Sequence, residues 1–295
     1  MAEPVISVVI PTRDRCAVLA KTLESLARQV EVPGPFEVIV VDDGSTDSTQ
    51  SLLRSVDLGG SALKSVLLDN GGPARARNRG IAAASGERIL LLGDDTIPEP
   101  GCLAVHAAAD SDTGIQGMID WDPDVGITDV MRFLAPEGPQ FWFKGLGEGS
   151  RVPWTSVVSA NLSAPRSWFV DEPFDERFTE ACMEDTELSW RWHRRQWKVR
   201  FSGAARCLHH HRYDELEPFL AKQRRAGLWA RRAVGIHPTL LVRFLLLPLT
   251  ITAERAGRAS LLRFRGRLER ELRMDLQCRA AFLNGFFFGG GGQST

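Results

Sequence analysis

The chain has 295 residues, of which 43% are hydrophobic and 25% are charged, and its formal net charge is −1. This length and composition allow one large α/β domain with an extension, or two domains, and they exclude disordered, collagen-like and disulfide-framework proteins. The five scattered cysteines form no CxxC pair, which argues against a cysteine-only zinc site and fits a reducing cytosol.

The sequence shows neither the pattern of a signal peptide nor that of a membrane-spanning helix. The most apolar late segment, 240–251, is interrupted by Arg243 and Pro248. It is also shorter than the ~20 residues that are needed to cross a bilayer. We therefore expect a cytoplasmic protein, either free or peripheral on the cytoplasmic face of the membrane.

The charge is unevenly divided along the chain. Residues 1–213 carry 22 Lys and Arg against 30 Asp and Glu, a balance of −8. Residues 214–295 carry 14 against 7, a balance of +7. The two parts are therefore expected to have different tasks, and the small overall charge gives no reason to expect nucleic acid as a partner.

Strand-like and helical segments alternate over the first hundred residues. Apolar, β-branched runs predict strands at 5–10, 36–41, 62–68 and 88–92, with helical periodicity in between. This alternation predicts a parallel sheet that is covered by helices on both faces.

The second half of the chain has a different character. Residues 120–155 are rich in glycine, proline and aromatic residues, which predicts loops and short strands. Further strands are predicted at 155–162, 199–201 and 206–208, and a helix is predicted at 185–195. From Glu215 onward the chain is helical and Arg-rich, and the final GGGGQST is expected to be disordered.

Paired carboxylates follow two of the predicted strands. Asp42-Asp43 comes after the second strand and Asp94-Asp95 after the fourth. Ligands of open parallel sheets bind outside the carboxyl ends of the strands, so both pairs are expected to face one crevice. Adjacent carboxylates repel each other, and a divalent cation with oxygen ligands, Mg²⁺ or Mn²⁺, would relieve that repulsion. A turn and helix cap is the alternative for Asp42.

Three common catalytic motifs are missing from the sequence. The first strand is followed by Pro-Thr-Arg-Asp-Arg and not by GxGxxG, which argues against a dinucleotide fold. The sequence also lacks GxxxxGK[ST], which excludes a P-loop nucleotide hydrolase, and it lacks the GxSxG nucleophile elbow.

Eight segments, in order, closely resemble the motifs of family 2 glycosyltransferases with the GT-A fold. They are ISVVIPTRDR, VIVVDDGSTDST, NGGPARARNRG, ILLLGDDTIPEPG, SANLSAPRSWF, FDERF, MEDTELSWRW and the segment around His209, and together they cover about residues 5–211. The resemblance implies an α/β fold with a Rossmann-like, mixed but mostly parallel sheet flanked by helices, followed by a C-terminal helical extension. We expect a nucleotide-sugar-binding and catalytic domain at 1–213, a basic helical extension at 214–288 and a disordered tail at 289–295.

The resemblance also implies roles for individual residues on the donor side of the site. Asp43 would contact the donor base, Arg77 would lie beside the base and the diphosphate, and Asp94 would contact the ribose or the sugar. Many relatives have Asp where this chain has Gly93, which affects only a supporting contact. The complete set implied to bind the donor nucleotide is Pro11, Thr12, Arg13, Asp43, Arg77 and Asp94.

The metal and the catalytic base follow from the same resemblance. Asp95 would bind Mn²⁺ or Mg²⁺ together with His209, although His210 or His211 could take the place of His209. Asp185 would be the catalytic base, and the residues implied to support it or to contact the acceptor are Glu184, Asn161 and Trp121. The aromatic residues at 121–154 either border the acceptor or pack in the core, and the sequence leaves both open.

Helical spacing gives two further expectations for the segment after Asp185. Glu187 is turned away from Asp185 and is expected to form a solvated i,i+4 pair with Arg191. Trp190 and Trp192 are two residues apart, so only one of them is expected to point inward.

The function that the resemblance implies is metal-dependent, inverting transfer of a sugar from a nucleoside-diphosphate sugar, with UDP as the expected nucleotide. The acceptor hydroxyl would belong to a polysaccharide, a lipid-linked glycan or a small natural product. Two alternatives are a sugar-nucleotide pyrophosphorylase, against which the absence of a Gly-rich loop argues, and a non-catalytic sugar-nucleotide-binding scaffold.

For the basic C-terminal region, membrane-surface contact and a packing or homodimer surface both remain open. The sequence does not name the donor sugar or the acceptor.

Overall fold

The computed structural model describes residues 3–246, 248–249, 251–253 and 267–289. The chain divides into two compact units, Met1–Arg212 and Tyr213–Thr295. Except for Gly289, the tail that was expected to be disordered lies outside the described residues.

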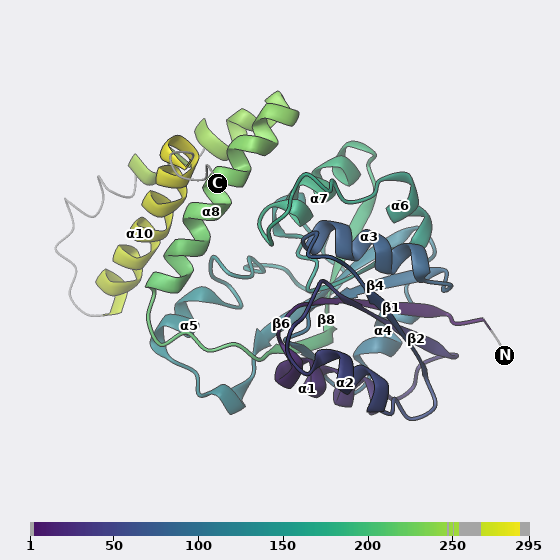
Figure 1. The fold of residues 1–295 in the computed structure, drawn as a ribbon. Coiled ribbons are helices and arrows are strands. Elements are labelled where there is room, and N and C mark those ends of the chain that lie inside the picture. The colour runs from purple at the N-terminus through teal and green to yellow at the C-terminus, as the bar shows by residue number, and fades with distance from the viewer. Residues whose placement is uncertain (1–2, 247, 250, 254–266, 290–295) are drawn as a thin grey trace. The chain divides into compact units, whose positions relative to one another are not determined.

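The first unit is a mixed eight-stranded sheet with helices on both faces (Figure 1). Its strands are β1 (Ile6–Thr12), β2 (Phe36–Asp42), β3 (Ala62–Leu67), β4 (Arg88–Leu92), β5 (Thr96–Pro98), β6 (Thr113–Trp121), β7 (Asn161–Pro165) and β8 (Lys198–His209). Its α-helices are α1 (Cys16–Ala27), α2 (Thr49–Ser55), α3 (Pro73–Ala83), α4 (Cys102–Ala107), α5 (Asp129–Leu134), α6 (Arg166–Asp171) and α7 (Glu184–Arg194). Short 3₁₀ turns occur at Pro123–Val125 and Trp154–Ser156.

The strand order is β3-β2-β1-β4-β7-β6-β8-β5. The first four strands in this order are mutually parallel, β7 is antiparallel to both of its neighbours, and β8 is parallel to β6 but antiparallel to β5. This arrangement confirms the predicted α/β class with a mostly parallel sheet. It also brings the carboxyl ends of β1, β2 and β4 to one edge, where ligands of such sheets bind.

Alternating side chains of the central strands build the two faces of the core. Val8 and Ile10 of β1 pack in one cluster with Leu19 and Leu23 of α1. On the other face α3 comes close to the sheet at Gly80, where an added Cβ would overlap the side chain of Val9. In Figure 1, α1 and α2 lie on one side of the sheet and α3 and α6 on the other.

Two strand predictions differ from the structure. The strand expected at 155–162 lies at Asn161–Pro165, because it pairs with all five residues of β4, from Leu92↔Asn161 to Arg88↔Pro165. The strands expected at 199–201 and 206–208 are one strand, β8. The polar break at Ser202-Gly203 does not end β8. Its pairing with β6 shifts register there, from Gly117↔Ser202 to Ile119↔Cys207, so the extra residues bulge within β8.

The second unit contains two long helices, α8 (Glu217–Ile236) and α10 (Arg267–Phe288), as the helical pattern predicts. Short helical turns follow α8 at Pro238–Leu240 and Val242–Leu246. The two helices approach closely at two glycines: a Cβ on Gly227 would overlap the Phe282 carbonyl, and one on Gly285 would overlap that of Arg224. In the described part of the chain, none of the helices combines the length and the apolar content that a membrane span requires.

A buried carboxylate ties the start of β2 to its surroundings. Glu37 Oε1 accepts hydrogen bonds from Ser7 Oγ at 2.7 Å, from Ser85 N at 2.6 Å and from Ser85 Oγ at 2.7 Å. Its Oε2 pairs with Lys64 Nζ at 2.7 Å. Burial alone would raise the pKa of Glu37, but Lys64, Ser7 and Ser85 together lower it to about 2.

We expect Glu37→Gln to lower the free energy of unfolding at neutral pH by roughly 3 kcal/mol, the value of a pKa depressed by this amount. Because the folded-state pKa lies below the ordinary value of 4.5, this stability is fully present above 4.5 and is lost as the pH falls towards 2. Urea denaturation at several pH values measures both effects. The exposed Glu24→Gln is the matched control, and a wild-type advantage that does not shrink on acidification would contradict the prediction.

Candidate functional site

The ends of β1, β2 and β4 are joined by short hydrogen bonds around Thr12. The Asp43 amide donates to the Thr12 carbonyl at 2.9 Å. The Thr12 hydroxyl donates to Asp94 Oδ2 at 2.8 Å. These contacts link the segment after β2 to the carboxylate pair after β4. Two other residues expected on the donor side lie nearby in sequence: Pro11 is half-buried within β1, and the exposed Arg13 donates to Asn70 Oδ1.

The two carboxylates after β2 have different surroundings. The Asp43 oxygens accept hydrogen bonds from the backbone amides of Gly71 and Gly72, both at 2.7 Å, in the turn that leads into α3. Asp42 is fully buried and accepts hydrogen bonds from the Ser45 amide, at 2.8 Å, and from Gln50. The expectation that both residues face the crevice is therefore wrong for Asp42, which has the alternative turn-stabilising role.

Arg15 bridges the two carboxylates after β4. Its Nε lies 3.0 Å from Asp94 Oδ1, and its Nη2 lies 2.6 Å from Asp95 Oδ2. Arg15 was not among the site residues expected from the sequence. The only signal for it was the second arginine of Pro-Thr-Arg-Asp-Arg, and its role depends on the turn between β1 and α1, which no local pattern describes.

The same surroundings push the pKa values of the two aspartates apart. Burial, with the charge of Asp95 added, raises the pKa of Asp94 to about 6, although Arg15 and Thr12 act against this. Burial also raises the pKa of Asp95, but the charges of His209 and Arg15 and the His209 hydrogen bond outweigh it and hold this pKa below the usual range. Asp95 is therefore the stable anion of the pair.

His209 is the histidine that lies beside Asp95. Its Nε2 is 3.3 Å from Asp95 Oδ2, and its ring lies against Trp121, with centroids 5.3 Å apart. His210 instead places Nδ1 2.6 Å from Asp122 Oδ2, and its Nε2 is 3.2 Å from Lys21 Nζ. His211 lies next to His209, with ring centroids 5.6 Å apart.

Asp95 and His209 fit a divalent cation as a two-donor site. Within the described residues no group of three or more His, Cys, Asp or Glu is arranged to hold a metal ion. However, Mg²⁺ usually keeps several waters and binds through one or two protein groups plus substrate phosphates. The converging oxygen and nitrogen of Asp95 and His209, and a buried His209 Nδ1 that makes no hydrogen bond, agree with such a partial ligand set.

A second group of charged residues forms where α3 meets the start of α7. Arg77 Nη1 lies 2.8 Å from Glu184 Oε1, and both side chains are buried. Burial and the neighbouring charge of Asp185 raise the pKa of Glu184, and Arg77 opposes this. Asp185 is half-buried; its Oδ1 accepts from the Thr186 amide at 2.7 Å, and its Oδ2 accepts from the Ser159 amide at 3.3 Å.

Two expectations for α7 are wrong for one reason. Glu187 and Arg191 form the expected pair at 2.9 Å, but Glu187 is only 1% exposed and not solvated. Trp190 and Trp192 are both buried. Trp192 packs edge-on against Phe169, with ring centroids 5.1 Å apart. The helix is covered on more than one side, so a single inward face does not describe it.

Asn161 and Trp121 hold neighbouring elements in place. The fully buried Asn161 Nδ2 donates to the carbonyls of Met118 and Ala205, at 3.1 and 2.8 Å, and its Oδ1 lies 2.9 Å from His106 Nε2. Trp121 Nε1 donates to the Met131 carbonyl at 2.7 Å, which fixes the ring beneath His209. Asn161 therefore connects β6, β7 and β8, and Trp121 supports the histidine beside Asp95.

Comparisons with known proteins agree with this architecture. Over 219 residues, 64% of the chain, it is 32% identical to the validoxylamine A glucosyltransferase of Streptomyces hygroscopicus subsp. limoneus, and the match covers 48% of that protein. The chain thus spans about half the length of the curated relatives that it matches.

Two solved structures have similar folds at low sequence identity. One is the mannosyltransferase PcManGT from Pyrobaculum calidifontis in complex with GDP-Man and Mn²⁺, with a TM-score of 0.66 and 16% identity over 98% of this chain and 89% of that one. The other is S. aureus TarS 1-349 in complex with UDP-GlcNAc, with a TM-score of 0.55 and 20% identity over 95% and 89%. Residues 7–128 match the model of the family described as glycosyl transferase family 2. Within its first unit the chain is thus similar to glycosyl transferase family 2, and this unit has the GT-A fold of the two solved structures.

Proposed function

We propose that the chain is a metal-dependent, inverting glycosyltransferase that moves a sugar from a nucleoside-diphosphate sugar to an acceptor hydroxyl. The observation that carries this proposal is the arrangement of Asp94, Asp95 and His209 at the carboxyl edge of the sheet. A carboxylate held anionic next to an imidazole suits a cation that binds a diphosphate. The match of residues 7–128 to the family model and the named relatives support the same reaction class.

The donor nucleotide would bind along the ends of β1 and β2. Pro11, Thr12 and Arg13 border this region, and Asp43 is fixed there by two backbone amides. We propose UDP as the nucleotide; the similar structures contain UDP-GlcNAc in one protein and GDP-Man with Mn²⁺ in another, which supports a nucleoside diphosphate in general. Asp94, joined to Thr12, would contact the ribose or the sugar.

Asp95 and His209 would hold the Mn²⁺ or Mg²⁺, which supplies positive charge to the diphosphate leaving group when it is bound. Asp185 would remove the proton from the acceptor hydroxyl, which attacks the anomeric carbon from the face opposite the diphosphate. A single displacement of this kind inverts the anomeric centre. The Ser159 and Thr186 amides orient the Asp185 carboxylate for this task.

Release of the nucleoside diphosphate tests the proposed function. The full chain is incubated with UDP-glucose, UDP-GlcNAc or GDP-mannose, with Mn²⁺ or with a chelator, and with and without candidate acceptor sugars. We expect one donor to give metal-dependent release that an acceptor accelerates. Pyrophosphate formed from a nucleoside triphosphate and a sugar phosphate would instead indicate a pyrophosphorylase, and donor binding without release would indicate a scaffold.

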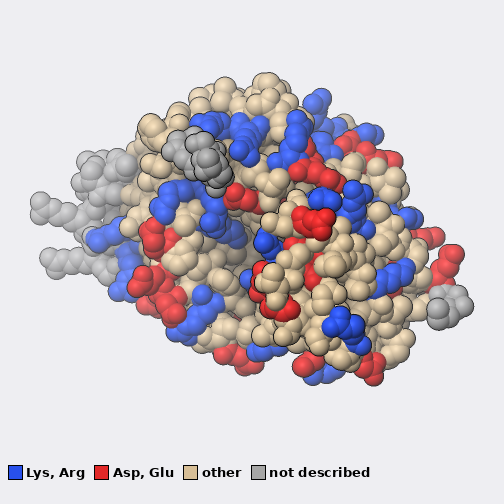
Figure 2. Space-filling model, viewed as in Figure 1, with Lys and Arg blue, Asp and Glu red and all other residues tan. Residues whose placement is uncertain are grey.

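We propose in addition that the second unit contacts an anionic membrane surface. Its balance of +7 accompanies exposed apolar side chains, among them Val242, Leu246, Phe287 and Phe288. Figure 2 shows several Lys and Arg side chains over the part of the surface formed by α8 and α10. Basic and apolar side chains together favour binding to the headgroup region of anionic lipid.

Sedimentation with phosphatidylglycerol vesicles tests this contact. The protein should bind and be released as salt is raised, because the attraction is screened over about 10 Å at 0.1 M salt. Phe287→Ser with Phe288→Ser should lower the bound fraction, and Leu67→Ser on an exposed position of β3 should not. If the double variant leaves vesicle binding unchanged but halves the mass seen by light scattering, the surface is a dimer contact.

A further inference from the structure

We propose that Asn78 and Arg191 are positioning residues that act on Asp185 through a chain of contacts. They clamp segment 172–174 between α3 and α7, which holds Phe174 against Arg77 and Arg77 against Glu184, the residue before Asp185. This inference rests on the proposed function in one respect: it takes Asp185 to be the catalytic base.

The clamp on the α3 side is the Asn78 side chain. Its Oδ1 accepts a hydrogen bond from the Phe174 amide at 3.0 Å, and its Nδ2 donates to the Phe174 carbonyl at 2.9 Å. The same Nδ2 donates to Glu176 Oε1 at 3.0 Å. A side-chain amide that satisfies both backbone groups of one residue fixes the position and the orientation of that residue.

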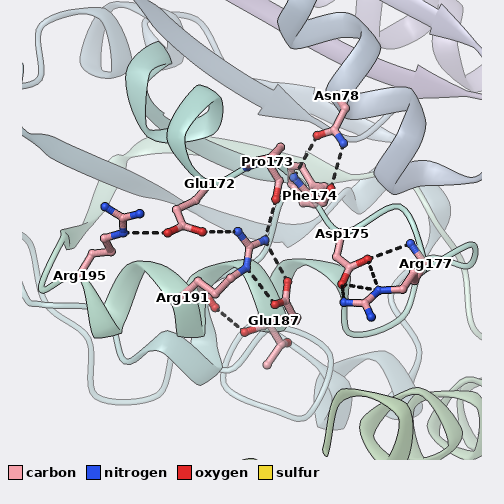
Figure 3. A network of polar contacts seen from close by, with 11 residues as sticks. Asn78, Glu172, Pro173, Phe174, Asp175, Arg177, Glu187, Arg191 and Arg195 are labelled. Atoms are coloured by element: carbon pink, nitrogen blue, oxygen red, sulfur yellow. Dashed lines mark hydrogen bonds and ion pairs between the residues drawn. The ribbon is translucent and has the colours of Figure 1, made fainter. Parts of the chain in front are cut away.

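The clamp on the α7 side is the Arg191 guanidinium, which lies at the centre of Figure 3. It donates to both Glu187 oxygens, at 2.9 and 3.0 Å, to Glu172 Oε2 at 2.6 Å and to the Pro173 carbonyl at 2.6 Å. Glu187 belongs to the first turns of α7, whereas Glu172 and Pro173 begin the connection that leads from α6. The planar guanidinium of Arg191 therefore links the segment that follows α6 to α7, the helix that carries Asp185.

The Asn78 clamp holds Phe174 itself, the Arg191 clamp holds the preceding Pro173, and Phe174 is buried at 2% exposure. The Arg77 guanidinium carbon lies 5.3 Å from the centroid of the Phe174 ring, and Arg77 Nη1 lies 2.8 Å from Glu184 Oε1. The ring thus limits where the guanidinium can lie, and the buried ion pair with Glu184 transmits that position to the first turn of α7.

The rest of the connection also touches the donor side of the site. A Cβ on Gly72 would overlap the Thr179 carbonyl, so the connection lies directly against the turn whose amides bind Asp43. A displaced segment 172–174 would consequently disturb the Arg77–Glu184 pair first, since Asp43 is held separately by its own two hydrogen bonds. Arg77 is buried and paired with Glu184, so in this inference it holds α7 and does not, as the resemblance implies, bind the donor. A loss of turnover with little loss of UDP affinity is therefore expected.

Two arginines of the same network provide matched controls. Arg195 donates to Glu172 Oε1 at 2.7 Å but is 52% exposed, and Arg177 pairs with Asp175 at 2.6 Å but is 68% exposed. In the network of Figure 3 both donate to carboxylates, and neither donates to the backbone of Pro173 or Phe174 as Arg191 and Asn78 do. Arg195→Ala and Arg177→Ala should therefore leave turnover and UDP affinity within about twofold of wild type.

The test compares Asn78→Ala and Arg191→Met in the wild-type background and in Glu184→Gln. UDP affinity with Mn²⁺ is measured by calorimetry, and turnover is measured as UDP release from UDP-glucose or UDP-GlcNAc, whichever the wild type cleaves. Each variant should lower kcat by about tenfold or more, because small displacements of a catalytic group are costly, with UDP affinity changed by less than about threefold. In the Glu184→Gln background the ion pair with Arg77 is already broken, so adding Asn78→Ala or Arg191→Met should lower kcat further by less than about threefold.

Equal losses of kcat in both backgrounds, or a parallel loss of UDP affinity, would overturn the proposal, since a merely structural role predicts them. If the wild type cleaves neither donor, the proposed function has failed. The chain of contacts is then tested by urea denaturation of the single and double variants. Coupling between Asn78→Ala and Glu184→Gln of about fivefold or more in the unfolding equilibrium constant supports the chain of contacts, and additive effects overturn it.

Discussion

Asp95→Asn is expected to abolish metal-dependent binding of UDP. The amide has lost the negative charge that attracts the cation, and Asp95 is the aspartate of the pair that its surroundings keep anionic. Loss of groups that only support a metal ligand costs about 10–100-fold in affinity, so loss of a direct ligand should cost at least about 100-fold. Calorimetric titration of UDP in the presence of Mn²⁺ measures the effect.

Asp122→Asn is the matched control for this experiment. Asp122 is also a buried aspartate next to a histidine, but its partner is His210. UDP affinity should stay within about threefold of wild type, because the direct ligands remain in place. Unchanged affinity in Asp95→Asn would remove Asp95 from the metal site, and a large loss in Asp122→Asn would move the site towards His210.

Asp185→Asn should leave UDP affinity nearly unchanged while turnover falls by about 100-fold or more, the usual contribution of a general base. UDP affinity and turnover should separate because the proposed base would act on the acceptor and not on the diphosphate. The Thr186 and Ser159 amides donate to different oxygens of Asp185, at 2.7 and 3.3 Å, so the single oxygen of Asn can keep only one of these bonds. Retention of the shorter bond from Thr186 should be enough to keep the fold.

Turnover is measured as UDP release with saturating donor, next to calorimetry under the same conditions. Asp171→Asn, an exposed carboxylate at the end of α6, should behave as wild type. Wild-type turnover in Asp185→Asn would show that another group takes the proton, with Glu184 the nearest candidate in the chain.

Local sequence patterns predicted the parts of the fold that are set by near neighbours. The strands β1, β2 and β4 are mostly apolar because helices cover both faces of the sheet, and Asp94-Asp95 comes one residue after the end of β4. The ends of β7 are set by its pairing with β4, and the residues of β7 alone do not indicate them.

The site was predictable only as far as it depends on adjacent residues and on the family resemblance. Asp94 and Asp95 stand out because two neighbouring carboxylates at a strand end are unusual. Arg15 does not stand out, since its pairing with both of them joins positions about 80 residues apart. The burial of Glu187 likewise depends on the connection from α6, which helical periodicity does not describe.

Three consecutive histidines stand at the end of β8, and the strand pairing selects one of them for the place beside Asp95. The pairing of β8 with β5 sets His209 opposite Thr96, and the His210 amide donates to the Asp95 carbonyl at 2.8 Å. Strand register, and not side-chain preference, therefore decides which imidazole meets Asp95. A deletion of one residue earlier in β8 would bring His210 into that place, and a deletion of two would bring His211. For the metal site proposed above, the histidine run would therefore keep an imidazole beside Asp95 after a small deletion ahead of it.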